Sequence, residues 1–202
     1  QELRQAVDHA CRRFGGPAAR VTPAGADWML ELFHGPTFAF KDVALSLLPA
    51  LMNLSRRHLN RQGQTAILTA TSGDTGSAAM AGFANDPHSQ VLVFYPAQGI
   101  SEIQRRQMTC LEAPNVHAVA LEGNFDEAQA EVKEAFQDRE LARDAAVAGI
   151  EFSSANSVNI ARLLPQVVYY VWAWLRLREA NALPRDGHLA VAVPTGNFGN
   201  IL

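Results

Sequence analysis

Cysteine, net charge and long apolar runs are all scarce in this sequence of 202 residues, and each shortage excludes a class of protein. Its two cysteines, Cys11 and Cys110, are far apart and have no CxxC spacing, which indicates reduced cytosolic thiols rather than a disulfide framework. The net charge is −3 with no basic stripe, so nothing points to nucleic acid or to an anionic membrane. The longest apolar segment, 158–177, contains arginine, proline and glutamine and is too polar for a bilayer span. We therefore expect a cytoplasmic protein without a nucleic-acid or membrane partner.

Several common catalytic signatures are missing as well. The histidines have no metal-ligand spacing, so we expect no metal site and a structural or solvent-exposed role for each of them. They are His9, His34, His58, His88, His117 and His188. There is no GxSxG elbow for serine hydrolysis, and the glycine-rich loops match neither GxGxxG nor a loop ending in GKS or GKT. Dinucleotide and Walker-type nucleotide sites are therefore poorly supported.

The sequence does contain enough apolar residues for a substantial core, with 48% hydrophobic and 18% charged residues. Short apolar segments alternate with helical patterns, which predicts parallel βαβ units in an open sheet with helices on both faces. The predicted strands are 28–33, 65–70, 91–95, 116–121, 150–152 and 189–193, and the predicted helices are 1–14, 42–59, 77–85, 101–111, 126–137 and 157–179. Pro49 is expected to kink or divide the second helix and Pro165 to interrupt the last. The fold class is therefore α/β, one core over 1–202 with a possible smaller βα subdomain at about 65–150.

One lysine, Lys41, follows an almost uncharged segment and opens a predicted helix. A lysine approached by apolar residues can have its pKa lowered by loss of hydration, which makes the free amine available for Schiff-base chemistry. The alternative is a solvated lysine in the first turn of a surface helix, where most lysines lie. The segment by itself leaves both interpretations open.

Two glycine-rich loops each connect a predicted strand to a predicted helix. Residues 71–76, Thr-Ser-Gly-Asp-Thr-Gly, combine hydroxyl groups and backbone N–H groups at the start of a helix, an arrangement suited to a carboxylate or phosphate. The alternative is simple N-capping by Ser72, Asp74 or Thr75. Residues 194–200, Pro-Thr-Gly-Asn-Phe-Gly-Asn, have backbone amides that could wrap one phosphate, or could form only a tight turn.

A third polar segment, residues 153–162, leads into the last long helix. Asn156 or Ser157 is expected to cap that helix. Arg162 follows Asn159 by three residues on the same helix face, from which it could reach an anion. The alternative is an arginine on the surface or in an ordinary ion pair.

Three motifs in a set order resemble those of the threonine synthases, which are pyridoxal-phosphate enzymes of fold type II. They are Phe-Lys-Asp around Lys41, the Thr-Ser-Gly-Asp-Thr-Gly loop and the Gly-Asn-Phe-Gly-Asn loop. The resemblance extends over nearly the whole chain. It implies that Lys41 is the Schiff-base lysine that forms the internal aldimine. The implied phosphate cup of the cofactor is Gly196, Asn197, Phe198, Gly199 and Asn200. The implied substrate contacts are Ser72, Gly73, Asp74, Thr75, Asn156, Ser157, Asn159 and Arg162.

The implied reaction converts O-phospho-L-homoserine and water into L-threonine and phosphate. Two alternatives stay open: a threonine-synthase-like lyase acting on another phosphorylated amino acid, and a non-catalytic βα module that only binds anions. The chain begins with Gln1 and ends at Leu202, directly after a glycine loop, so we expect a fragment of a longer protein. The family's N-terminal extension and the C-terminal residues near the pyridine nitrogen are not in it. We expect the fragment alone to be inactive or nearly so, and a homodimer is possible for the parent enzyme.

Overall fold

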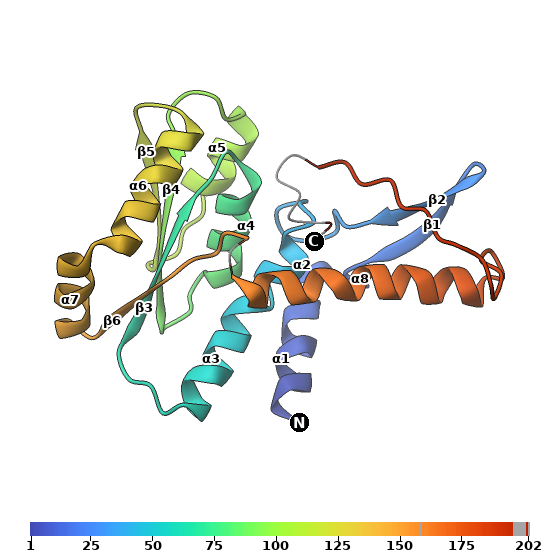
Figure 1. Ribbon diagram of the computed structural model, residues 1–202, viewed down its shortest axis with the longest axis horizontal. Coiled ribbons are helices and arrows are strands. Elements are labelled where there is room, and N and C mark those ends of the chain that lie inside the picture. Colours follow the sequence, from blue (N-terminus) through green and yellow to red (C-terminus); the bar gives the residue numbers. More distant parts are fainter. Residues whose placement is uncertain (158, 196–200, 202) are drawn as a thin grey trace.

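A parallel β-sheet forms the centre of the larger part of the molecule (Figure 1). The computed structural model describes residues 1–157, 159–195 and 201. Four strands lie in the order β5-β4-β3-β6, and every neighbouring pair is parallel. They are β3 (Gln64–Ala70), β4 (Ser89–Pro96), β5 (Val116–Leu121) and β6 (Ile150–Ser153). The α/β class with an open parallel sheet is confirmed.

Helices cover both faces of this sheet because side chains alternate along each strand. Ile67, Val91 and Val93 point to one face, where they pack in a buried cluster with α4 (Asp74–Phe83) and α5 (Glu102–Thr109). Leu68 and Ala70 point to the other face, where they pack against α6 (Phe125–Gln137). A further helix, α7 (Arg139–Val147), contacts β6 at the sheet edge. Connections between parallel strands bring the loops after β3, β4 and β6 to one edge of the sheet.

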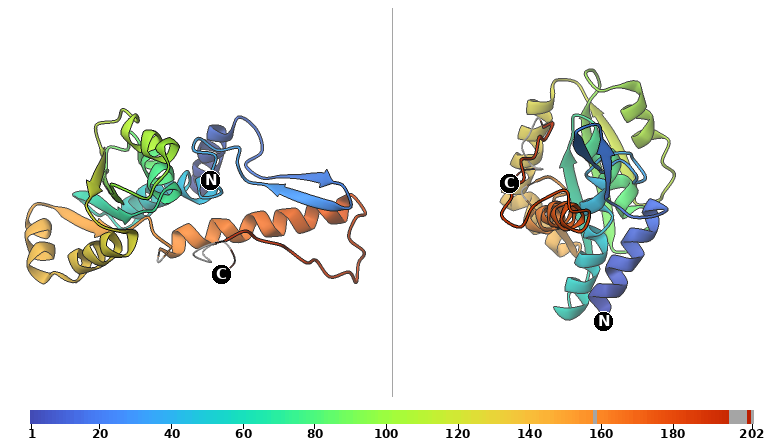
Figure 2. Two further views of the ribbon diagram at one scale, coloured as in Figure 1. Left: turned by 90° about the horizontal axis from the view of Figure 1, so that it is seen from above. Right: turned by 90° about the vertical axis from the view of Figure 1, so that its right-hand side faces the viewer.

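A long helix, α8 (Ile160–Glu179), leaves the sheet and carries an antiparallel hairpin along its outer half (Figure 2). The hairpin consists of β1 (Arg20–Ala24) and β2 (Asp27–Glu31), joined at Gly25, whose φ of +67° suits a tight turn. Trp172 of α8 donates from Nε1 to the carbonyl oxygen of Ala19 at 3.1 Å, which ties the helix to the base of the hairpin. None of the helices in the described ranges is both long and apolar enough to cross a bilayer.

The N-terminal helices pack beside the sheet and bring Lys41 to it. They are α1 (Glu2–Cys11), the 3₁₀ helix η1 (Arg12–Phe14), α2 (Asp42–Leu45) and α3 (Leu48–His58). The predicted helix 42–59 is divided into α2 and α3, as Pro49 suggested. Pro49 lies in the first turn of α3, where a missing N–H removes no helical hydrogen bond.

Two predictions about elements were wrong. Pro165 does not interrupt α8, which continues from Ile160 to Glu179; only one backbone hydrogen bond is lost there, and Pro165 lies on the buried face. Residues 189–193 form no strand, because no strand in the described part of the chain pairs with them. The sequence patterns also missed β1 and α7. Whether the region of about 65–150 is a separate subdomain stays a prediction.

Candidate active site

Lys41 lies at the start of α2, where its ammonium group is only partly hydrated. Its side chain is 19% exposed, and its Nζ lies 3.5 Å from Oδ2 of Asp74 and 5.4 Å from the ring centroid of Phe40. Burial lowers the pKa of Lys41, the ion pair with Asp74 opposes that shift, and the positive charge of Arg162 adds to it. The solvated surface lysine is therefore the weaker interpretation, and the geometry favours an amine that loses its proton readily.

The turn before Lys41 is held by the next residue, Asp42. Its side chain is 1% exposed and accepts two hydrogen bonds from Thr37, at 2.8 Å from the backbone N and 2.7 Å from Oγ1. A Cβ at Gly35 would collide with the Asp42 side chain, so this turn requires glycine. Phe38 has a φ of +62°, an uncommon conformation for a residue that is not glycine. The Asp42 carboxylate is thus bonded to Thr37 and fixes the segment that leads to Lys41.

Removing the Asp42 carboxylate should destabilise the folded protein. We expect Asp42→Ala to lower the free energy of unfolding by about 3 kcal/mol, because buried donors of Thr37 lose their acceptor. Burial raises the pKa of Asp42. The folded protein therefore keeps a proton on Asp42 at pH values where the unfolded chain has already released it. The stability that Asp42 contributes falls as the pH rises through this range. The loss should therefore be larger in acid than at neutral pH in urea unfolding. Thr37→Val, which removes one hydrogen bond, should lower the free energy of unfolding by only about 1 kcal/mol. Equal losses in the two variants would contradict the role of the Asp42 carboxylate in holding this turn.

The loop 71–76 presents Asp74 to Lys41. Thr71 is buried, and its Oγ1 accepts hydrogen bonds from the N–H groups of Gly73 at 3.0 Å and Gly76 at 3.1 Å. No side chain caps α4 by a hydrogen bond from its N-cap position, which Gly73 occupies. Capping by Ser72, Asp74 or Thr75 is therefore not what organises this loop. Thr71 does so, and Oδ2 of the Asp74 carboxylate faces Lys41.

The segment 153–162 is fixed to the same edge of the sheet. Asn156 donates from Nδ2 to the carbonyl oxygen of Ala70 at the end of β3, at 3.0 Å. Asn159 caps α8 by accepting from the N–H of Ala161 at 3.0 Å, so the prediction that Asn156 or Ser157 is the cap was wrong. The amides of Asn156 and Asn159 thus have structural partners, whereas Ser157 lies half-buried beside them.

Arg162 is the most unusual residue of this segment because it is a buried cation. Its side chain is 4% exposed, and one guanidinium nitrogen donates to the carbonyl oxygen of Ala155 at 3.0 Å. Its Nε is buried without a hydrogen-bond partner among the described residues. Burial lowers the pKa of Arg162 to about 10. The interpretation as a surface arginine was therefore wrong. A buried guanidinium with donors to spare is suited to bind an anion.

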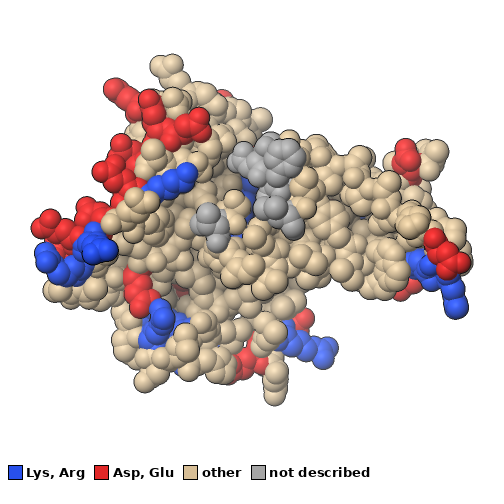
Figure 3. All heavy atoms as spheres, in the orientation of Figure 1, with Lys and Arg blue, Asp and Glu red and all other residues tan. Residues whose placement is uncertain are grey.

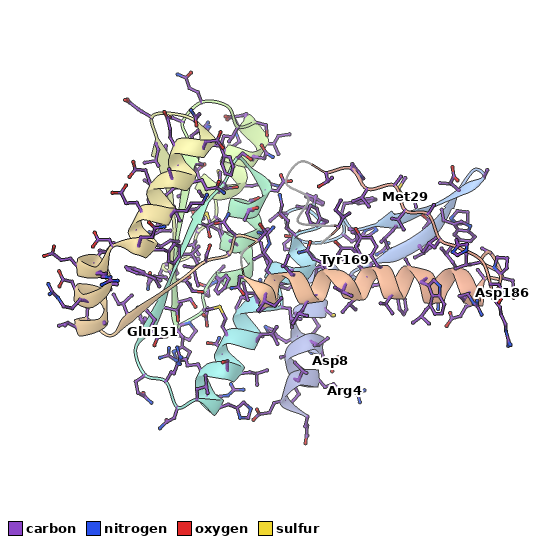
Figure 4. All side chains as sticks on the ribbon, viewed as in Figure 1. Arg4, Asp8, Met29, Glu151, Tyr169 and Asp186 are labelled. Atoms are coloured by element: carbon purple, nitrogen blue, oxygen red, sulfur yellow. The ribbon has the colours of Figure 1, made fainter. Side chains whose placement is uncertain are left out.

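The predicted site residues of three segments meet at one place: Lys41 at α2, Asp74 at α4 and Arg162 at α8. Tyr169, labelled in Figure 4, lies on the same helix as Arg162 and is buried like it. The predicted phosphate cup, 196–200, lies outside the described residues. Sequence reasoning missed Gln104, whose Nε2 donates to Oδ1 of Asp74 at 2.7 Å. The only sequence signal for Gln104 is its spacing from Ser101 in a capping box, which gives no hint of the contact with Asp74.

The charges around this site are unevenly distributed over the surface. On the face shown in Figure 3, acidic side chains gather over the upper part of the sheet region and both signs of charge lie at its left edge, whereas the surface along α8 carries almost no charge until its far end. At Lys41 itself, the carboxylate of Asp74 favours the ammonium form and the positive charge of Arg162 disfavours it.

Comparison with known proteins places this geometry in a family. The family described as pyridoxal-phosphate dependent enzyme matches residues 28–202. The chain belongs to this family. It is 43% identical to threonine synthase of Pseudomonas aeruginosa over 178 residues, covering 88% of this chain and 35% of that protein. It is 41% identical to human threonine synthase-like 1 over 185 residues, covering 89% of this chain and 24% of that protein.

The fold of the chain also matches a solved structure. Pyridoxal-phosphate-bound threonine synthase of Brucella melitensis superposes with a TM-score of 0.83 at 39% identity, over 99% of this chain and 41% of that one. The resemblance to threonine synthases and the expected cofactor, pyridoxal phosphate, are therefore confirmed. The chain spans well under half the length of each of these proteins.

The described residues fit pyridoxal phosphate. Its aldehyde requires an amine that is not fully protonated, and the shielded Nζ of Lys41 meets that requirement. Its phosphate requires N–H donors or cations, and the residues predicted to supply them, 196–200, lie outside the described residues, so Arg162, whose buried Nε has no partner among the described residues, is left for a second anion.

Proposed function

We propose that this chain forms the lysine-bearing part of an enzyme that converts O-phospho-L-homoserine and water into L-threonine and phosphate, with pyridoxal phosphate bound through Lys41. The observation that carries the proposal is the meeting of a partly dehydrated Lys41 with a buried Arg162 and the loop 71–76. A substrate with both an amino-acid group and a phosphate requires a reactive amine and a separate anion site close together. The identities with threonine synthases support this choice of substrate.

Each residue has a defined task in the proposed reaction. Pyridoxal phosphate supplies an electron-accepting ring, which stabilises negative charge at the substrate carbon that loses a proton. The free amine of Lys41 would take and return protons at the α- and β-carbons of the substrate. Asp74, 3.5 Å from Nζ, stabilises the ammonium form whenever Lys41 holds a proton.

The anion-binding groups position the rest of the substrate. Ser72 and Thr75, in the loop at the start of α4, provide hydroxyl and backbone donors for the substrate carboxylate, whereas the N–H of Gly73 is donated to Thr71 and its backbone only lines the site. The guanidinium of Arg162 binds the substrate phosphate. Its positive charge stabilises the negative charge of the phosphate as that group leaves the substrate. Asn156, Ser157 and Asn159 shape the wall next to Arg162. The phosphate of the cofactor is assigned to Gly196, Asn197, Phe198, Gly199 and Asn200, which lie outside the described residues.

The proposal is tested by adding O-phospho-L-homoserine to the 202-residue chain loaded with pyridoxal phosphate. We expect the visible absorbance of the cofactor to change with O-phospho-L-homoserine and much less with L-homoserine, which lacks the phosphate. Released phosphate and threonine are measured in the same samples, and little of either is expected, because the chain spans only part of its relatives' length. An equal spectral response to both compounds would contradict the proposed substrate.

A second candidate is a lyase acting on a phosphorylated amino acid without making threonine. It stays open because a protein named only as threonine synthase-like, human threonine synthase-like 1, is 41% identical to this chain, close to the 43% of the P. aeruginosa threonine synthase. Phosphate release without threonine would select this candidate. A cytoplasmic location and a homodimer stay predictions.

A further inference from the structure

Gln104 is connected to Lys41 through the carboxylate of Asp74, which contacts both side chains. Its Nε2 donates to Oδ1 of Asp74 at 2.7 Å, and the other oxygen of Asp74, Oδ2, faces Nζ of Lys41 at 3.5 Å. The three side chains come from α5, α4 and the start of α2, and therefore join the parallel sheet to the lysine.

The orientation of the Gln104 amide is fixed at both ends. Its Oε1 accepts from the backbone N of Ser101 at 3.2 Å and from the Ser101 hydroxyl at 3.1 Å, in the capping box of α5. Nε2 must therefore point away from Ser101, toward Asp74. Gly73, with a φ of +155°, passes directly beneath this amide, and a Cβ at that position would collide with it. The loop is thus built around the Gln104 side chain.

Capping of α5 alone does not explain these contacts. A capping box uses only the acceptor oxygen of the glutamine, and a glutamate would serve equally well. The amide donor is needed only because a carboxylate lies opposite it. Asp74 is 43% exposed, so without this hydrogen bond its side chain would be free to turn into solvent.

We propose that Gln104 is a positioning residue for Lys41, acting by holding Asp74 so that one carboxylate oxygen faces the lysine amine. Gln104 thereby sets how readily Lys41 gives up its proton. The charged groups that face Lys41 are Asp74 from α4, which favours the ammonium, and Arg162 from α8, which disfavours it. The carboxylate of Asp42 accepts two hydrogen bonds from Thr37 and is not among the groups that shift the pKa of Lys41. Of these groups, only Asp74 is held by Gln104. The importance of this role for catalysis rests on the proposed function of Lys41.

The proton affinity of Lys41 can be measured without any cofactor. The sequence contains two lysines, Lys41 and the exposed Lys133 on α6, so trace acetylation with acetic anhydride followed by peptide mass spectrometry reads both in one sample. The pH midpoint of labelling at Lys41 reports its pKa, and Lys133 serves as the internal reference. The experiment uses the 202-residue chain.

The expected shifts have opposite signs for two substitutions at position 104. Gln104→Leu frees Asp74, so the midpoint of Lys41 should fall, by less than the roughly one pH unit expected for Asp74→Asn. Gln104→Glu keeps the cap of α5 but places a second carboxylate at Asp74, so the midpoint should rise. Loosening of the fold would move Lys41 toward an ordinary exposed lysine, and therefore cannot produce the fall expected for Gln104→Leu.

Two controls separate positioning from capping. Ser101→Ala weakens the cap but leaves the backbone N of Ser101 to hold the amide, so the Lys41 midpoint should stay unchanged. In an Asp74→Asn background, Gln104→Leu should produce no further shift. An unchanged midpoint in Gln104→Leu, or a shift that persists in the Asp74→Asn background, would overturn the proposal.

Cofactor binding is scored separately on the same variants. If pyridoxal phosphate does not attach to Lys41 but the midpoint shifts as expected, positioning by Gln104 stands and the proposed function fails. The reverse result, attachment without a shift, rejects the role of Gln104 and leaves the proposed function intact.

Discussion

Lys41→Ala is expected to abolish covalent attachment of pyridoxal phosphate to the chain. After addition of the cofactor and reduction with borohydride, the unsubstituted chain should gain the mass of one cofactor on the peptide that contains Lys41. The variant should show no such gain, because no other amine lies in this partly dehydrated position beside Asp74 and Arg162 among the described residues. Any turnover by the complete enzyme should fall by about 10²–10⁴-fold, the usual contribution of a general base.

Lys133→Ala is the matched control for this experiment. Lys133 is the other lysine of the sequence and is exposed on α6, on the far side of the sheet from α4 and α5. Its removal should leave the modification of Lys41 unchanged. If Lys41→Ala still acquires one cofactor, and Lys133→Ala does not, the assignment of the reactive lysine is wrong.

The segments that form the parallel strands, and the helix that begins at Lys41, were predictable because both depend on local sequence. Strands β3, β4, β5 and β6 are short apolar segments separated by helical patterns, and the sheet forms where these patterns alternate. The segment 189–193 has the same apolar character, yet it forms no strand, because strand formation also requires a neighbouring strand. Local pattern therefore predicts which segments can pair, but not whether a partner lies beside them.

The environments of Arg162 and Gln104 could not be predicted, because they arise from packing between distant segments. Arg162 is buried only because α8 packs against α2 and the loop before it folds over the end of β3. Gln104 reaches Asp74 only because α4 and α5 lie side by side on one face of the sheet. Sequence spacing identified Arg162 as a possible anion contact and left its burial open.

Arg162→Met is expected to separate stability from function. Arg162 is buried with one hydrogen bond to a carbonyl oxygen, without a carboxylate partner among the described residues and with its Nε unpaired there. Burying a cation in this way is unfavourable, and methionine fills similar space without charge. We therefore expect the free energy of unfolding to stay within about 1 kcal/mol of the unsubstituted chain, or to rise, in urea titrations.

The same substitution should strongly impair anion binding. Loss of a buried guanidinium that binds the substrate phosphate should weaken the response to O-phospho-L-homoserine by about 100-fold. The positive charge of Arg162 lowers the pKa of Lys41, so its removal should raise that pKa and shift cofactor attachment to higher pH. Arg4→Met, on the exposed face of α1 (Figure 4), is the control and should change neither property.

A large loss of stability in Arg162→Met, with an unchanged response to O-phospho-L-homoserine, would make Arg162 a structural residue. The opposite result would mean that the fold tolerates an unfavourable buried charge at the point where three segments meet. A buried positive charge at Arg162 that does not stabilise the fold is what we expect of a group that binds the substrate. Measuring unfolding and ligand response on one variant therefore distinguishes packing from recognition at Arg162.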